Sequence, residues 1–312
     1  RGSEEAESAW AHSVHAEPSG LAPGRGYFYR FQALGQQSPV GRTRTAPAPD
    51  AAATLSFAIA SCQRFDHGHW AAWRHAAAQP LDLVLFLGDY IYEYPSLPNA
   101  LRAHEGGLCR SLADYRARYA QYKRDPALQA AHAACPWAVV WDDHEVANDY
   151  AALEGGLPLA DFAAQRAAAY QAFWEHQPLG RAQRPQGRGL RLHDRLDWGA
   201  LARIHLLDLR QYRDPQACQP PVGRSRVLPL KDCPALLEPQ RSLLGAAQER
   251  WLADGWDRER PWNLLAQTTL MARFTSTDPA SDTGPSVWTD GWDGHGPARR
   301  RLLQGAHERG LK

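Results

Sequence analysis

The chain has 312 residues, of which 44% are apolar and 22% charged, and this balance is typical of a folded globular protein and excludes extensive disorder. The 35 Lys and Arg nearly equal the 34 Asp and Glu, so the net charge of +1 gives no broad field for nucleic acid or an anionic membrane, and we expect no nucleic-acid partner. No apolar stretch reaches the roughly 20 residues that cross a bilayer, since the richest, residues 81–88, contains Asp82, and we expect no transmembrane segment.

The first part of the chain has strand character. Residues 20–24 form a turn-rich break, and residues 27–31, Tyr-Phe-Tyr-Arg-Phe, form an aromatic run typical of a strand. Residues 45–50 form a connector rich in Pro and Ala, and proline stiffens such a segment while removing backbone donors. We therefore predict a domain boundary near residue 47, with residues 1–46 ending a β-rich unit and residues 47–312 forming the next domain.

The pattern changes after this connector. Leu55 to Ser61 is predicted as a buried strand, Trp70 to Gln79 as a helix, and Leu81 to Gly88 as a second buried strand. Two apolar strands joined by a helix indicate parallel pairing with helices on the faces of the sheet, which is an α/β fold. Catalytic residues of such folds tend to lie at the carboxyl ends of the strands.

The remaining elements follow the same logic of apolar strands and amphipathic helices. The predicted strands are residues 137–141, 201–208 and 262–267, and the predicted helices are residues 112–123, 126–134, 160–176 and 246–254. A basic run, Arg299 to Arg301, is most often the solvated face of a helix, and we assign it no role.

Three of the predicted strands end in groups suited to metal binding: Cys62, Asp89 and the acidic run that begins at Asp142. A buried strand that feeds a Gly-Asp turn places the carboxylate of Asp89 at the edge of the sheet, where two cations can share it. Tyr92 lies three residues on, and a phenolate with the Cys62 thiolate suits a ferric ion. The alternatives are a turn or helix-capping Asp89, a buried inert Cys62 and a packed aromatic Tyr92.

The run Trp141-Asp142-Asp143-His144-Glu145-Val146-Ala147-Asn148-Asp149-Tyr150 is the richest in ionisable groups. Burying adjacent carboxylates costs free energy through desolvation and through their mutual repulsion. A bound cation compensates both of these costs. Asp143 is a candidate metal ligand, Asn148 a candidate neutral oxygen ligand, and His144 a candidate donor to a phosphoryl or leaving oxygen. Trp141 is a candidate wall of the site. The alternative is a solvated acidic loop that caps a helix.

Arg210 follows another apolar strand, and its guanidinium is a candidate for binding two phosphate oxygens at once. Asp142 is a second candidate for contact with the substrate. A structural ion pair is the alternative for Asp208 and Arg210.

These motifs, in this order, resemble those of the PhoD-like alkaline phosphatases, which are related to the purple acid phosphatases. The matching text is Ser61-Cys62-Gln63, Leu87-Gly88-Asp89-Tyr90-Ile91-Tyr92-Glu93-Tyr94, and Trp141-Asp142-Asp143-His144-Glu145 with Asn148-Asp149-Tyr150. Weaker matches run through nearly the whole chain, among them Asp208-Leu209-Arg210-Gln211-Tyr212-Arg213 and Asp290-Gly291-Trp292-Asp293-Gly294.

The resemblance implies an αββα metallophosphoesterase core behind an N-terminal β-sandwich domain like those of immunoglobulins or fibronectin, of which residues 1–46 would be the tail. It implies Fe3+ (iron) held by Cys62, Asp89 and Tyr92, and Ca2+ (calcium) held through Asp89, Asp143 and Asn148. His144 would face a small phosphomonoester or phosphodiester, and a metal-activated hydroxide would attack phosphorus in line. The protein would be secreted or periplasmic, and we expect a monomer.

The family pattern also has a later Gly-Asp-Val-His strand end, so the resemblance implies a chain truncated at both ends. A non-catalytic remnant with an incomplete metal site, acting as a structural or interaction module, is the competing interpretation. A third keeps the fold and changes the substrate to a phospholipid or a cell-wall polymer diester.

Five cysteines are present. If Cys62 binds iron, pairing Cys109 with Cys135 and Cys218 with Cys233 would suit an oxidising compartment. Four free thiols in a cytoplasmic protein fit the sequence equally well.

Overall fold

The computed structural model describes residues 1–220, 223–274 and 284–311. Two three-stranded sheets form its centre. The first is fully parallel, with the order β5-β6-β7, and the second has the order β11-β9-β8, in which β11 is parallel and β8 antiparallel to β9. The strands are β5 (Phe57–Ala60), β6 (Leu83–Leu87), β7 (Trp137–Val140), β8 (Asp194–Trp198), β9 (Ala202–Leu206) and β11 (Trp262–Ala266).

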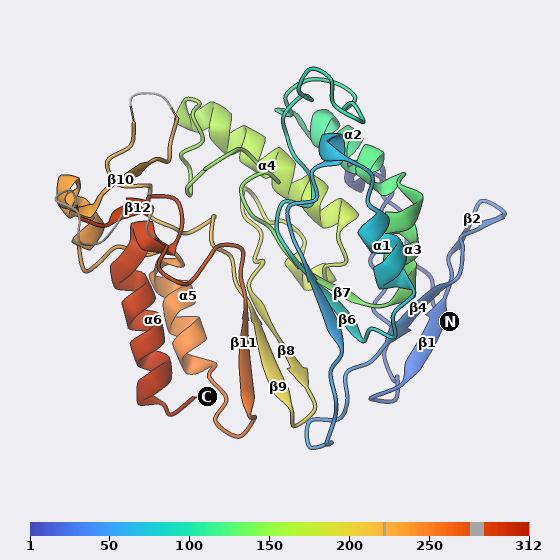
Figure 1. Cartoon of the computed structure of the whole chain (residues 1–312). Coiled ribbons are helices and arrows are strands. Elements are labelled where there is room, and N and C mark those ends of the chain that lie inside the picture. Colours follow the sequence, from blue (N-terminus) through green and yellow to red (C-terminus); the bar gives the residue numbers. More distant parts are fainter. Residues whose placement is uncertain (221–222, 275–283, 312) are drawn as a thin grey trace.

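Helices flank this pair of sheets on both sides, as Figure 1 shows, so the predicted αββα arrangement is confirmed. Beside the first sheet are α1 (Ala71–Ala77), α2 (Leu112–Lys123) and α3 (Pro126–Ala134), and beside the second are α5 (Gly245–Asp254) and α6 (Gly296–Glu308). The long α4 (Leu159–His176) buries Tyr170 and Phe173 in one core with residues of both sheets. The short 3-10 helices are Ser8–Trp10, Phe65–His67, Arg181–Gln183, Leu230–Asp232, Pro234–Leu237 and Trp292–His295.

The predicted strands and helices after residue 54 are all present, with ends that differ by a few residues. One expectation was wrong: the strand that ends at Ser61 is not buried. It forms the edge strand β5, whose outer face is open, and the Ile59 side chain is 63% exposed. The central strand of the sheet is β6, which is buried along most of its length.

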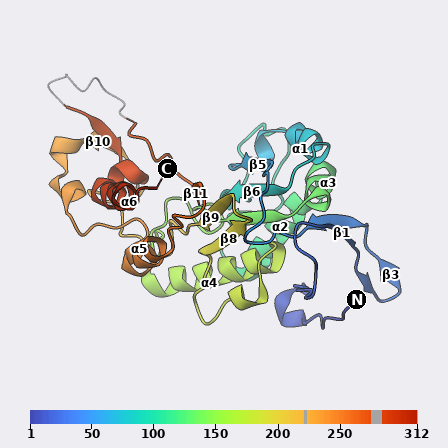
Figure 2. The same cartoon turned by 90° about the horizontal axis from the view of Figure 1, so that it is seen from below.

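Residues before the connector form two hairpin pairs, with β1 (Gly26–Tyr29) antiparallel to β4 (Gly41–Arg44) and β2 (Gln32–Ala33) antiparallel to β3 (Gln36–Gln37). The strand predicted around residues 27–31 is therefore β1. Arg42 Nε donates to the carbonyl of Ala134 at 2.7 Å, and Arg44 forms an ion pair with Asp82. This hairpin lies on the side of the molecule away from α5 and α6 (Figure 2).

A third small sheet pairs β10 (Val227–Pro229) antiparallel with β12 (Ser286–Trp288). Leu236 and Val287 pack in one apolar cluster with Cys233, which forms a disulfide with Cys218, and this confirms that pairing. The predicted pairing of Cys109 with Cys135 was wrong, because both are buried as free thiols. The Cys109 thiol contacts the carbonyl of Asp114 in the first turn of α2, whereas Cys135 ends α3.

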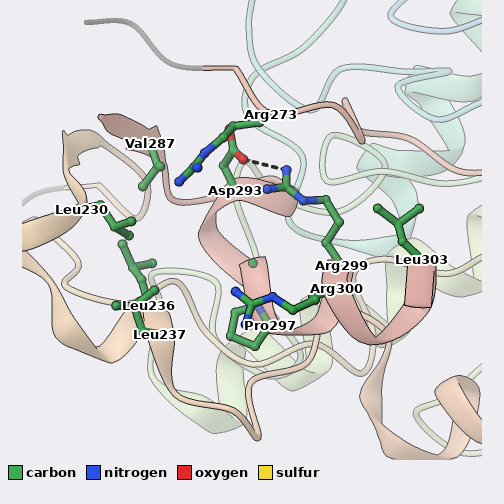
Figure 3. Close-up of a pocket in the computed structure, with 11 residues that line it drawn as sticks. Leu230, Leu236, Leu237, Arg273, Val287, Asp293, Pro297, Arg299, Arg300 and Leu303 are labelled. Carbon is green, nitrogen blue, oxygen red and sulfur yellow. Dashed lines mark hydrogen bonds and ion pairs between the residues drawn. The ribbon is translucent and has the colours of Figure 1, made fainter. Parts of the chain in front are cut away.

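A hollow of about 250 Å³ lies between this small sheet and α6 (Figure 3). Its apolar wall includes Leu236, Val287 and Leu303, and Arg273 and Arg300 stand at its border. None of the candidate site residues lines it.

Among the described residues, no helix is long and apolar enough to cross a membrane.

Acidification should destabilise the fold through buried histidines, and His205 on β9 is one of them. Its ring is fully buried beside Trp256, and burial lowers its pKa to about 4 from the usual 6.5. The unfolded chain therefore binds a proton more readily than the folded protein, and stability falls as the pH drops from 6.5 towards 4. One unit of pKa corresponds to about 1.36 kcal/mol, so the loss reaches about 3 kcal/mol.

Thermal unfolding of the wild type and of His205→Gln between pH 7.5 and pH 4 checks this prediction. The melting temperature of the variant should depend less steeply on pH. Parallel curves for the two proteins would contradict it.

Candidate metal centre

The carboxyl ends of β5, β6 and β7 bring the sequence-predicted residues together. The parallel ladder continues past the strands, because the Cys62 N–H donates to the Gly88 carbonyl at 3.1 Å and the Gln63 N–H donates to the Asp89 carbonyl at 3.2 Å. Leu87 pairs with Val140 in the register of β6 and β7, so the acidic run starts beside the Gly-Asp turn. Three strand ends thus meet at one edge of the sheet.

The backbone turns sharply at these ends. Cys62, Asp89 and Asp149 have φ angles of 55°, 58° and 54°, in the left-handed region that L residues other than Gly seldom adopt. Each such residue costs on the order of 1 kcal/mol or more, and such costs concentrate at functional sites. Six other residues that are not glycine share this conformation elsewhere in the described chain, but these three lie in and beside the acidic cluster.

Gly88 is required at the turn, and Gly88→Ala should damage both fold and site. Its φ is 80°, and an added Cβ would lie 2.6 Å from Asp142 Cβ and 2.7 Å from the Asp142 nitrogen. The Asp142 backbone cannot yield without moving the acidic run, so we expect a loss of roughly 1–3 kcal/mol in unfolding free energy. Chemical denaturation measures this loss, and Gly107→Ala, at an exposed position with open space around the Cβ, is the control. Equal stability of the two variants would contradict the prediction.

The centre of the site is a cluster of Asp89, Asp143 and His144, whose ligand atoms all lie within 4.8 Å of one another. Both carboxylates are buried. Oδ2 of Asp89 accepts a hydrogen bond from the Tyr92 hydroxyl at 2.8 Å, but its Oδ1 is buried without a partner among the described residues. Burial and the nearby Asp143 charge raise the pKa of Asp89 to about 6. A buried carboxylate oxygen without a donor is well suited to a cation.

Cys62 and Tyr92 both contact Asp89. Cys62 is exposed as a residue at the sheet edge, whereas its sulfur is partly desolvated and interacts with the side chains of Asp89 and Tyr92, so it is not a thiol enclosed in the core. Burial of the sulfur and the charge of Asp89 raise the pKa of Cys62 to about 11, and the same two causes raise the pKa of the Tyr92 hydroxyl. Without a cation, this environment therefore favours the thiol and the phenol. A bound cation would reverse the effect and favour the thiolate and the phenolate.

His144 is oriented by Glu93, a residue to which the sequence assigned no role. Glu93 is almost fully buried, and its Oε2 lies 2.7 Å from His144 Nδ1, while its Oε1 accepts from the Asn148 N–H at 2.7 Å. A carboxylate only accepts, so Nδ1 carries the proton and Nε2 is left for the cluster. Burial opposes the charged imidazole, but the Glu93 hydrogen bond and the nearby carboxylates raise the pKa of His144 to about 10. The ring lies between Tyr92 and Tyr94, with centroids 4.2 Å and 5.3 Å away.

Glu145 ties two strand ends together. Its carboxylate accepts backbone N–H groups of Asp89 at 3.1 Å, Tyr90 at 2.5 Å and Asp142 at 2.8 Å. Three donors to one buried carboxylate fix the turn that carries Asp89 against the run that carries Asp143. In the sequence, only the position of Glu93 and Glu145 within the motifs 87–94 and 141–150 indicated that they belong to the site.

Arg210 is almost fully buried and is surrounded by carboxylates. It binds Asp290 through two hydrogen bonds of 2.9 Å and 2.7 Å, Asp142 at 2.5 Å and Asp143 at 3.4 Å. Asp208 accepts the backbone N–H of Arg210 and the Trp141 indole N–H, both near 3 Å. The guanidinium and Asp142 are thus engaged with each other, which supports the ion-pair alternative for Arg210, with Asp142 and Asp290 as the partners in place of Asp208.

Asn148 and Trp141 were the two further candidates in the acidic run. Asn148 is exposed, and its backbone rather than its side chain makes the recorded contact with Glu93. Trp141 was expected to wall the site, and this was wrong. It has no exposed surface and stacks on Tyr170 with centroids 4.2 Å apart, because it belongs to the core behind the sheet.

Comparisons with known proteins agree with this site. The family model of the PhoD-like phosphatases matches residues 57–312, and that of their N-terminal domain matches residues 1–47. Alkaline phosphatase D of Bacillus subtilis (strain 168) is 43% identical over 97% of this chain and 52% of its own length. A solved structure of PhoD superposes with a TM-score of 0.92 and 42% identity over 99% of this chain and 59% of that one.

A purple acid phosphatase from yellow lupin (Lupinus luteus) seeds is far more distant, with 13% identity and a TM-score of 0.47 over 82% of this chain and 38% of that one. The chain spans slightly more than half the length of the relatives that it matches closely. Because a family model covers most of the chain and the ordered motifs meet at one edge of the sheet, the chain belongs to the PhoD-like phosphatase family.

Proposed function

We propose that this chain carries the catalytic site of a metal-dependent hydrolase of phosphomonoesters or phosphodiesters. The observation that supports it most is the buried, unpartnered Oδ1 of Asp89 beside Asp143 and His144. Packing alone gives no reason to gather two carboxylates there, whereas a cation stabilises both. The family and the relative named an alkaline phosphatase point to the same chemistry.

We propose two sets of donors, each suited to a different kind of cation. Cys62, Asp89 and Tyr92 would hold Fe3+, because a thiolate and a phenolate are anionic ligands that a ferric ion stabilises. Asp89, Asp143 and Asn148 would hold Ca2+, which takes carboxylate and amide oxygens. Bound ions would supply an activated hydroxide and would offset the negative charge of the phosphoryl oxygens.

The side chains around the ions have separate tasks in this proposal. His144, held by Glu93, keeps a proton near the cluster and donates it to a phosphoryl or leaving oxygen. Arg210 neutralises Asp142 and Asp290 and keeps Asp143 in place, so it acts on the carboxylates rather than on the substrate.

The wider setting follows from the same resemblance. We propose residues 1–46 as the end of an N-terminal β-sandwich domain and residues 47–312 as the phosphatase domain. The disulfide between Cys218 and Cys233 supports a secreted or periplasmic location, since such bonds persist in oxidising compartments. We propose a monomer that acts on small phosphoesters.

Hydrolysis of p-nitrophenyl phosphate and bis-p-nitrophenyl phosphate by the full-length natural protein, with elemental analysis of the same sample, tests the proposal. Turnover that stops on chelation and returns with added metal supports the hydrolase. Bound metal without turnover of either ester would favour the non-catalytic alternative. Absence of both metal and turnover would overturn the site assignment.

A further inference from the structure

Asp149, near the end of the acidic run, has contacts on its N–H, its carboxylate and its carbonyl. Its N–H donates to Oδ2 of Asp143 at 2.7 Å. Its carboxylate Oδ2 accepts from the Ser225 hydroxyl at 2.6 Å. Its carbonyl accepts from Gln216 Nε2 at 2.7 Å and from Arg224 Nε at 3.1 Å. The residue has a left-handed φ of 54°, so these contacts maintain a backbone conformation that aspartate does not favour by itself.

The three side chains that hold Asp149 come from one region, more than 60 residues later in the chain. We call Gln216, Arg224 and Ser225 the Asp149 clamp. Gln216 lies two residues before Cys218, which is joined to Cys233. Arg226, next to Ser225, exchanges hydrogen bonds with Thr289 at 3.0 Å, in line with the pairing of β10 and β12. The clamp is therefore anchored independently of the loop that it grips.

A single hydrogen bond links the conformation of Asp149 to the carboxylate of Asp143. The Asp149 N–H fixes Oδ2 of Asp143, whose Oδ1 lies 3.4 Å from Arg210. If Asp149 left the left-handed conformation, its N–H would rotate away from Asp143, and the carboxylate would lose the donor that sets its orientation.

We propose, on the basis of the function proposed above, that the Asp149 clamp positions the Asp143 carboxylate for metal binding, with Ser225 as its main positioning residue. Ser225 makes the shortest of the three contacts and is the only one of the three side chains that reaches the Asp149 carboxylate. Outer residues that orient a metal ligand typically change metal affinity or activity by roughly 10- to 100-fold when removed.

Ser225→Ala in the full-length protein tests this. Calorimetric titration of chelator-treated protein with calcium chloride should show an affinity weakened by about 10-fold or more, and kcat for bis-p-nitrophenyl phosphate should fall while KM changes little. Ser225→Thr keeps the hydroxyl and should restore both quantities. Arg224→Gln, which removes one bond to the Asp149 carbonyl, should give a smaller change in the same direction.

Glu154→Gln is the matched control, because the exposed Glu154 carboxylate contacts Arg224 at 3.2 Å and is not one of the groups that bind Asp149. It should behave like the wild type. Wild-type calcium affinity in both Ser225→Ala and Arg224→Gln would overturn the inference, as would a loss in Ser225→Ala that Ser225→Thr does not restore. A wild type that neither binds metal nor hydrolyses the ester would instead mean that the proposed function has failed.

Discussion

Asp89→Asn should abolish metal-dependent hydrolysis while leaving the metal-free protein at least as stable as the wild type. Asparagine still accepts from the Tyr92 hydroxyl, but it lacks the charge that two cations would share. Metal ions contribute several kcal/mol to such reactions, so we expect turnover to fall by about a thousand-fold or more. Turnover of bis-p-nitrophenyl phosphate measures this.

The raised pKa of Asp89 determines how Asp89→Asn changes the stability of the metal-free protein. The pKa of Asp89 is raised from 3.8 to about 6, chiefly by burial, so the unfolded chain loses this proton more readily and the folded state loses stability as the pH rises from 3.8 to 6. Above pH 6 the cost is about 3 kcal/mol at about 1.36 kcal/mol for each unit of pKa. Thermal unfolding of metal-free protein at pH 7 should therefore show Asp89→Asn melting at or above the wild type.

Asp82→Asn is the control for this variant. Asp82 is also a buried carboxylate beside the first sheet, but it is paired with Arg44 and accepts from the Ser56 N–H at 2.9 Å. Its replacement should lower stability and leave turnover intact. If Asp89→Asn were the less stable of the two and still active, Asp89 would be a structural residue.

His144→Asn should slow hydrolysis according to the leaving group. General acid catalysis contributes roughly 100- to 10,000-fold, and a poor leaving group such as an alkoxide depends on it, whereas p-nitrophenolate departs without a proton. For a dialkyl phosphate diester, whose leaving group is an alkoxide, we expect kcat/KM to fall by at least about 100-fold. For bis-p-nitrophenyl phosphate, we expect kcat/KM to fall by much less. Comparison of the two substrates measures the difference.

Glu93→Gln should shift the same ratio in the same direction by a smaller amount, because an amide still meets His144 Nδ1 but no longer stabilises its charge. An equal loss on both substrates in His144→Asn would show that the residue binds metal or phosphate and is not the proton donor.

The central elements of the fold were predictable because their signals are local. A continuous apolar run marks the buried β6, and alternating helices and strands mark the parallel sheet. The order of strands is not local, so the sequence did not indicate that β5 lies at an edge with Ile59 exposed. The strand β8 was missed because charged residues, Asp194 and Asp197 among them, dilute its apolar pattern.

The candidate site divides in the same way. Strand ends in a parallel sheet meet at one edge, so the proximity of Cys62, Asp89, Asp143 and His144 followed from the predicted topology. The partners that orient them did not. Arg210 meets Asp290 across 80 positions, a tertiary contact with no local pattern. The prediction that Cys109 pairs with Cys135 was wrong for a similar reason. The number of cysteines does not indicate which of them lie close together in the fold.

The most direct test of the account is anomalous X-ray diffraction from crystals of the full-length protein, with data collected at the iron absorption edge. We expect a metal peak bounded by Cys62, Asp89 and Tyr92, with further density for a lighter cation near Asp89 and Asp143. A metal-loaded, active protein whose anomalous peaks all lie away from Asp89 would contradict it.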